Sequence, residues 1–189
     1  MKIFKRAKIV PFLIFTAIFV GILATQIALN NFKLVAGPTT LESNRLAHLE
    51  HEYKTLKLTD QNGLNYEVAK SSAKIVIINF WAAWCSPCLE ELPGLVQLQK
   101  KFTPGEVAIY GVNEDVEDQD KNITRIAKKY VVEFPIIPDR DSLIANKLFI
   151  ANLPQTLIFK DGKLIDLIQG QKDFAAVEFI ESLKSAIKH

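Results

Sequence analysis

The chain has 189 residues, enough for one well-packed domain with an appendage and too few for two domains of ordinary size. Hydrophobic residues make up 49% of the sequence, a high share for a soluble domain, so one segment should carry an apolar excess. The net charge is +2, and four basic residues before position 30 contribute more positive charge than that. The rest of the chain is therefore faintly acidic. An acidic remainder without a basic stripe argues against nucleic acid as a partner.

The N-terminal segment has the pattern of a membrane anchor. Residues 1–8 carry the four basic side chains, and Ile9 to Leu29 is almost continuously apolar. As a helix this run would span about 30 Å, the thickness of a bilayer core. The positive-inside rule then leaves residues 1–8 in the cytoplasm and the residues after the anchor on the periplasmic side of the inner membrane. A cleaved signal peptide is the alternative, although the run is long for one and no small-x-small cleavage site follows.

Residues 30–52 are expected to form a polar linker between this anchor and the domain. The linker contains a helix-breaking Gly37-Pro38 pair and a polar, helix-compatible stretch from Leu41 to Glu52. His48 and His51 would share one face of such a helix, but no cysteine or third histidine lies near them. We therefore expect no metal site there.

Residues 53–189 have the pattern of an α/β domain that begins with a hairpin and a buried strand. Residues 54–60 alternate in polarity, Asn62-Gly63 is a turn signal, and residues 65–68 can pair back as a hairpin. Residues 75–81 are β-branched and aromatic on both faces, as in a central strand covered on both sides. A helical pattern to Phe102, a strand over residues 107–112 and a helical pattern over residues 123–130 follow. A strand, a helix and a second strand in this order predict that the two strands pair in parallel.

The C-terminal part has a different pattern. Two apolar runs, residues 156–160 and 164–168, flank an Asp161-Gly162 turn, and a helical pattern extends from Phe174 to Ile187. This predicts an antiparallel hairpin followed by a helix. The whole domain should therefore have a central mixed β-sheet flanked by helices.

The only two cysteines, Cys85 and Cys88, are separated by Ser86 and Pro87 where the buried strand gives way to a helix. A structural zinc site would need four ligands, and a structural disulfide closing so short a loop would constrain the unfolded chain little. A helix start offers free N–H groups and the positive end of its dipole, which stabilise a thiolate on the first cysteine. The pair is therefore predicted to exchange dithiol for disulfide without a bound cofactor.

The segment from Asn79 to Pro93, N-F-W-A-A-W-C-S-P-C-L-E-E-L-P, resembles the active-site segment of the thioredoxin superfamily, specifically its membrane-anchored TlpA/ResA-like branch. Further matches follow in the order in which they occur in that family: G-V-N at 111–113, F-P at 134–135 and N-L-P-Q-T-L-I-F at 152–159. The resemblance covers about Tyr53 to Lys188. The resemblance implies a thioredoxin-like fold with an added N-terminal hairpin and a central helical insert. It also implies a thiol-disulfide exchange protein.

The resemblance assigns roles to individual residues. Cys85 matches the attacking cysteine of the family and Cys88 the resolving one, with Ser86 and Pro87 between them in the active-site loop. Pro154 matches the family's cis-proline, although most X-Pro bonds in folded proteins are trans.

Three further residues are expected at the site. The backbone of Leu153, which precedes the matched cis-proline, and the side chain of Trp84 are the expected substrate contacts. Thioredoxin's buried acid is replaced here by Asn79, which cannot take a proton. Glu91 lies on the same helix face as Cys88 and matches a glutamate of ResA-like proteins, so it is the candidate proton acceptor for Cys88. The alternative for Glu91 is an acid that merely stabilises the helix start.

These observations lead to an expected function. The chain should be an extracytoplasmic disulfide reductase that receives electrons from a membrane thiol donor and acts on disulfide-containing exported proteins, with apocytochrome c as the first expected substrate. A thiol oxidase for exported proteins is the nearest alternative. A peroxidase would be expected to carry Thr-x-x-Cys, and a metal-handling protein of this fold a wider cysteine spacing with a distal histidine; neither pattern occurs. A redox-inert binding module also stays open.

Overall fold

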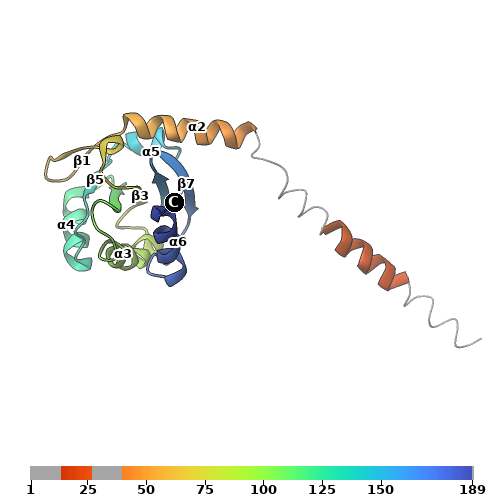
Figure 1. Cartoon of the computed structure of the whole chain (residues 1–189). Coiled ribbons are helices and arrows are strands. Elements are labelled where there is room, and N and C mark those ends of the chain that lie inside the picture. Colours follow the sequence, from red (N-terminus) through yellow and green to blue (C-terminus); the bar gives the residue numbers. More distant parts are fainter. Residues whose placement is uncertain (1–13, 27–39, 189) are drawn as a thin grey trace, which may run out of the picture. The chain divides into compact units, whose positions relative to one another are not determined.

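The computed structural model describes residues 14–26 and 40–188, and it divides the chain into two units, Met1–Arg45 and Leu46–His189 (Figure 1). In the first unit residues 14–26 are helical. Among the residues that the structure describes, no helix is both long and apolar enough to span a bilayer. The predicted anchor, Ile9 to Leu29, lies partly outside the described residues.

The elements follow one another as α2 (Thr40–Thr55), β1 (Lys57–Thr59), β2 (Asn65–Glu67), the 3₁₀ helix η1 (Val68–Lys70), β3 (Ile75–Trp81), α3 (Ser86–Gln99), β4 (Val107–Asn113), α4 (Gln119–Tyr130), β5 (Ile136–Pro138), α5 (Leu143–Lys147), β6 (Gln155–Lys160), β7 (Lys163–Gln169) and α6 (Val177–Lys188). This order confirms the predicted N-terminal hairpin, the central strand, the helical insert and the C-terminal hairpin with its helix. It adds β5 and α5, which the sequence analysis did not predict.

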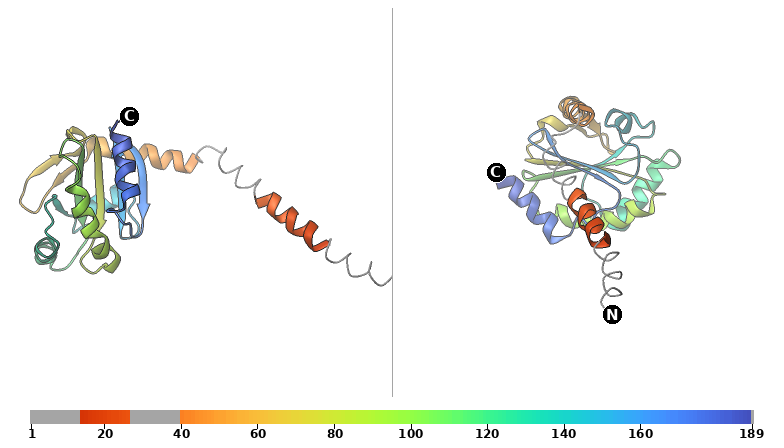
Figure 2. Two further views of the ribbon diagram at one scale, coloured as in Figure 1. Left: turned by 60° about the horizontal axis from the view of Figure 1, so that its bottom comes forward. Right: turned by 90° about the vertical axis from the view of Figure 1, so that its right-hand side faces the viewer.

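The main sheet has five strands in the order β5-β4-β3-β6-β7. β3 runs parallel to β4 and antiparallel to β6, so the sheet is mixed, as predicted. All seven residues of β3 are buried. Its side chains alternate between two cores, with Ile77 and Trp81 in the one that includes α3, α4 and α6, and Ile78 and Phe80 in the one that includes α2 and α5. Figure 2 shows these helices on the two faces of the sheet.

The second half of α2 belongs to the compact domain. Leu49 is fully buried in the second core, and the Tyr53 ring packs against Phe159 with 4.5 Å between centroids. His48 stacks on Phe149 at 4.3 Å, and its Nε2 lies 2.8 Å from a backbone carbonyl oxygen. Residues 40–52 of the predicted linker are therefore helical, as the helix-compatible pattern allowed, and the last turns of α2 pack on the sheet. Residues 30–39 lie outside the described residues. Leu49 and Tyr53 are an i, i+4 pair, whereas the other leucines of the helix, Leu41 and Leu46, are exposed, so the pattern of apolar residues does not identify the buried face.

A substitution in α2 tests whether the second half of this helix belongs to the folded domain. Leu49→Ala should lower the free energy of unfolding by about 2–5 kcal/mol, because it leaves a cavity in a packed core. Leu41→Ala is the matched control in the same helix, since Leu41 is 81% exposed, and it should change the free energy by less than about 0.5 kcal/mol. Urea unfolding of the two variants would measure both values. Equal stabilities would show that α2 is not part of the folded unit.

Candidate active site

The two cysteines lie at the junction between β3 and α3 and form a disulfide. Cys85 is the N-cap residue of α3, and its Sγ accepts a hydrogen bond from the backbone N–H of Cys88 at 3.3 Å. Pro87, in the first turn, has no N–H to leave unsatisfied and suits a helix start. Cys85 is 5% exposed and Cys88 1%. Cys85 is therefore the more exposed residue of the pair, and it lies at the end of the helix where a thiolate is stabilised.

The loop in front of Cys85 is held by a buried carboxylate that the sequence analysis did not identify. Both oxygens of Asp115 accept a hydrogen bond from the backbone N–H of Ala83 at 3.1 Å, and Asn113 Nδ2 donates to Asp115 at 2.9 Å. Asp115 and Asn113 are almost fully buried at the end of β4, next to β3 in the sheet. The only signal in the sequence was a pair of polar residues directly after an apolar strand.

The loop before β6 lies beside the same end of β3. The Leu153–Pro154 peptide bond is cis, as predicted, and the residue after it, Gln155, pairs with Phe80 of β3. Trp84 is 70% exposed. Trp84 and Leu153 line one cavity of about 500 Å³, so the structure brings the two predicted substrate contacts together.

Glu91 lies on α3 with its carboxyl group inside the protein, 3% exposed. Asn79 Nδ2 donates to Glu91 Oε1 at 2.8 Å and to Thr156 Oγ1 at 2.9 Å, and the backbone N–H of Lys172 donates to Glu91 Oε2 at 3.0 Å. Asn79, at the position of thioredoxin's buried acid, thus fixes the carboxyl group of Glu91. This pairing across α3, β3 and β6 was not predicted.

The environment of Glu91 brings its titration close to neutral pH. Burial is the largest effect and raises the pKa of Glu91 to about 7, while the hydrogen bonds from Asn79 and from the Lys172 amide act in the opposite direction. Glu91 lies three residues after Cys88 on α3. A carboxyl group with such a pKa can accept and return a proton near neutral pH, as general acid–base chemistry requires.

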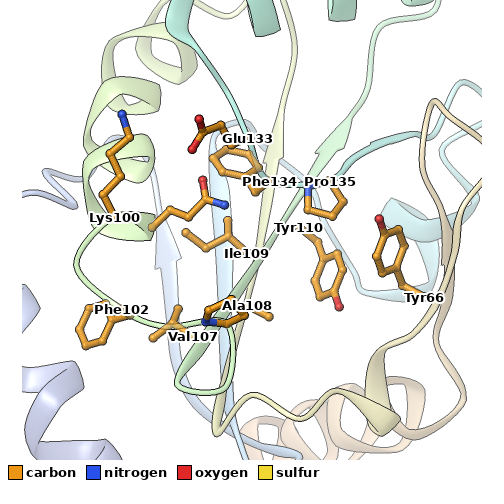
Figure 3. Close-up of a pocket in the computed structure, with 12 residues that line it drawn as sticks. Tyr66, Lys100, Phe102, Val107, Ala108, Ile109, Tyr110, Glu133, Phe134 and Pro135 are labelled. Atoms are coloured by element: carbon orange, nitrogen blue, oxygen red, sulfur yellow. The ribbon is translucent and has the colours of Figure 1, made fainter.

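A second cavity, of about 370 Å³, lies at the other end of β4 (Figure 3). Aromatic rings of Tyr66, Phe102, Tyr110 and Phe134 line it together with the first residues of β4. Neither cysteine lines it. Within the part of the chain that the structure describes, no three histidine, cysteine, aspartate or glutamate side chains come close enough together to hold a metal ion.

Comparisons with known proteins agree with this geometry. The sequence pattern of the AhpC/TSA family matches residues 49–167. The thiol-disulfide oxidoreductase ResA of Bacillus thuringiensis subsp. konkukian is 31% identical over 142 residues, which cover 75% of this chain and 80% of that protein. ResA of Bacillus subtilis is 33% identical over 114 residues, 60% of this chain and 63% of that protein.

Solved structures give the same result for the fold. The crystal structure of a thiol:disulfide interchange protein of the thioredoxin family from Chlorobium tepidum superposes with a TM-score of 0.59 at 25% sequence identity, covering 70% of this chain and 92% of that chain. The predicted thioredoxin-like fold and the resemblance to ResA-like proteins are thereby confirmed. The chain belongs to the AhpC/TSA family and is a thioredoxin-like thiol-disulfide oxidoreductase of the ResA type.

Proposed function

We propose that the protein is a membrane-anchored disulfide reductase on the extracytoplasmic side of the inner membrane. One observation carries the proposal: the Cys85–Cys88 pair lies at the N-terminus of α3, and the buried carboxyl group of Glu91 follows on the same helix. This arrangement provides a stabilised thiolate for attack on a disulfide and a proton acceptor for the second thiol.

The reaction transfers two electrons from the dithiol to the substrate disulfide. The Cys85 thiolate forms a bond to one substrate sulfur, and the other substrate sulfur leaves as a thiolate that takes up a proton. Cys88 then loses its proton to Glu91 and attacks Cys85 Sγ, which releases the second substrate thiolate. The enzyme ends as the Cys85–Cys88 disulfide and the substrate as a dithiol.

The substrate chain would lie extended beside the cysteines. Leu153, immediately before the cis bond to Pro154, would offer its backbone to that chain, and Trp84, which lines the same cavity, would contact it. Main-chain hydrogen bonds of this kind bind many sequences.

The proposed direction of electron flow requires an electron donor. The chain has only two cysteines, so after each turnover the Cys85–Cys88 disulfide would be reduced by a thiol from outside the chain. In an oxidising compartment the pair would otherwise remain a disulfide. A membrane thiol carrier is the proposed electron donor, and anchoring through Ile9 to Leu29 would raise its effective concentration around the domain. Exported proteins with disulfides, apocytochrome c among them, are the proposed substrates.

A trapping experiment tests this role. In Cys88→Ser the mixed disulfide on Cys85 cannot be resolved, so partners should accumulate as covalent adducts that mass spectrometry can identify. We expect one membrane thiol carrier and a small set of exported proteins. The double variant Cys85→Ser/Cys88→Ser is the control and should trap nothing. A broad range of newly exported proteins together with a quinone-linked oxidase would instead indicate a thiol oxidase.

A further inference from the structure

The cavity between Trp84 and Leu153 lies where a substrate side chain next to the reacting cysteine would reach. Trp84 directly precedes Cys85, and Leu153 directly precedes Pro154. The cavity of about 500 Å³ extends from these two residues to α5 and the loop after it, where Ala145 and Ile150 supply apolar wall. It is therefore a pocket beside the disulfide with room for a long side chain.

Glu114 and Ser142 are the carboxyl and hydroxyl groups that line this cavity. The Ser142 hydroxyl donates to Glu114 Oε2 at 2.9 Å. Glu114 Oε1 is shielded from solvent and has no hydrogen-bond donor among the described residues. The side chain that interacts with it is Asp139, another carboxyl group, whose own oxygens accept from the backbone N–H groups of Ile144 and Ala145.

Two carboxyl groups that face each other need a proton or another cation between them. Burial, the largest effect, and the facing Asp139 raise the pKa of Glu114 to about 8, so Glu114 itself can hold this proton at neutral pH. The neighbouring carboxylate Asp115 points to the amide of Ala83 instead.

Among the described residues, no lysine or arginine lines the cavity. Two basic side chains close to it in the sequence have partners elsewhere: Arg140, next to Asp139, pairs with Asp120 at 3.7 Å, and Lys147 of α5 pairs with Glu52 at 3.9 Å. The cavity is therefore open to a cation from another molecule.

The lining matches the two parts of a lysine or arginine side chain. Ala145, Ile150 and Leu153 can contact the methylene stem, the Trp84 ring can lie against the cation, and Glu114 can accept its hydrogen bonds. We propose that this cavity is a subsite for one lysine or arginine side chain that flanks the substrate cysteine attacked by Cys85. The inference rests on the proposed exchange reaction and adds to it a preference for basic sequences. Binding of the cation releases the proton of Glu114 to solvent.

Peptide substrates test the preference. Each peptide carries one cysteine as a mixed disulfide with 2-mercaptoethanol, and one flanking position at a time is lysine, arginine, norleucine or glutamate. With the reduced full-length protein, lysine and arginine should raise the second-order rate constant about tenfold over norleucine at one flanking position. Because the cation competes with a proton, this ratio should increase as the pH rises towards the pKa of Glu114, about 8. A ratio near one at every position, or a ratio independent of pH, would overturn the proposal.

Two variants separate the subsite from general charge attraction. Glu114→Gln should bring the lysine peptide to the rate of the norleucine peptide. Glu117→Gln makes the same substitution at an exposed side chain that lines a different cavity beside Trp84, and it should keep the preference. If both variants lost the preference for the lysine peptide to the same extent, the proposed subsite would be refuted.

A neutral small disulfide distinguishes failure of the subsite from failure of the proposed function. The wild-type protein should reduce hydroxyethyl disulfide, which has no basic group to place in the cavity. If it does so and shows no preference among the peptides, the subsite is wrong and the exchange reaction stands. If it reduces neither, the proposed function itself is wrong.

Discussion

Cys85→Ser should lower the rate of disulfide exchange at least about a thousandfold, because the hydroxyl group that replaces the nucleophile forms no thiolate. Cys85 is the N-cap residue of α3 and the more exposed of the two cysteines. A stopped-flow assay with the reduced protein and a peptide disulfide would measure the effect. Thermal unfolding should show that the variant remains folded.

Cys88→Ser is the matched variant, since it also removes one thiol of the pair. It should retain the first attack by Cys85, seen as a single burst of released thiol, and lose turnover, because no second thiol resolves the mixed disulfide. If Cys88→Ser were inactive in the first step and Cys85→Ser retained it, the two roles would be reversed.

Glu91→Gln should lower the rate of exchange about a hundredfold, because an amide cannot take the proton of Cys88. The pH–rate profile should also change, since the step that depends on a group with a pKa of about 7 would be lost. Glu90→Gln is the control, as Glu90 is the exposed neighbour on the same helix and carries the same charge. Equal profiles for the wild-type protein and Glu91→Gln would assign Glu91 a purely structural role.

The same carboxyl group makes the stability depend on pH. The pKa of Glu91 is 4.5 in the unfolded chain, its ordinary value, and about 7 in the folded protein. Between these two pH values the folded protein therefore binds more protons than the unfolded chain does. Stability from Glu91 is therefore fully present below about pH 4.5 and is lost as the pH rises to about 7, by up to about 3 kcal/mol. Glu91→Gln should reduce the slope in this window, measured by urea unfolding at several pH values.

The sequence predicted those parts of the fold whose pattern is local. β3 is apolar on both faces because both faces are covered, and the C-terminal hairpin has its Asp161-Gly162 turn. β5 and α5 have only three and five residues, too few to show a period. The second half of α2 was assigned to the linker because its buried face has few apolar residues.

The residues of the candidate site that belong to a motif were predicted, and the contacts between distant residues were not. The Cys85–Cys88 pair and the cis bond at Pro154 could be located from a motif and a resemblance. The hydrogen bond from Asn79 to Glu91 joins residues on a strand and a helix, and the contact of Glu114 with Asp139 joins two loops. Such pairs form only when the chain folds, so one sequence without its structure does not indicate them.

The standard potential of the Cys85/Cys88 couple tests the proposed reductase most directly. The full-length protein would be equilibrated with a dithiothreitol or glutathione series, and the fraction of disulfide measured by alkylation and mass spectrometry. We expect a value close to that of thioredoxin, about −270 mV. A value close to that of DsbA, about −120 mV, would contradict the proposed direction of electron flow and indicate a thiol oxidase.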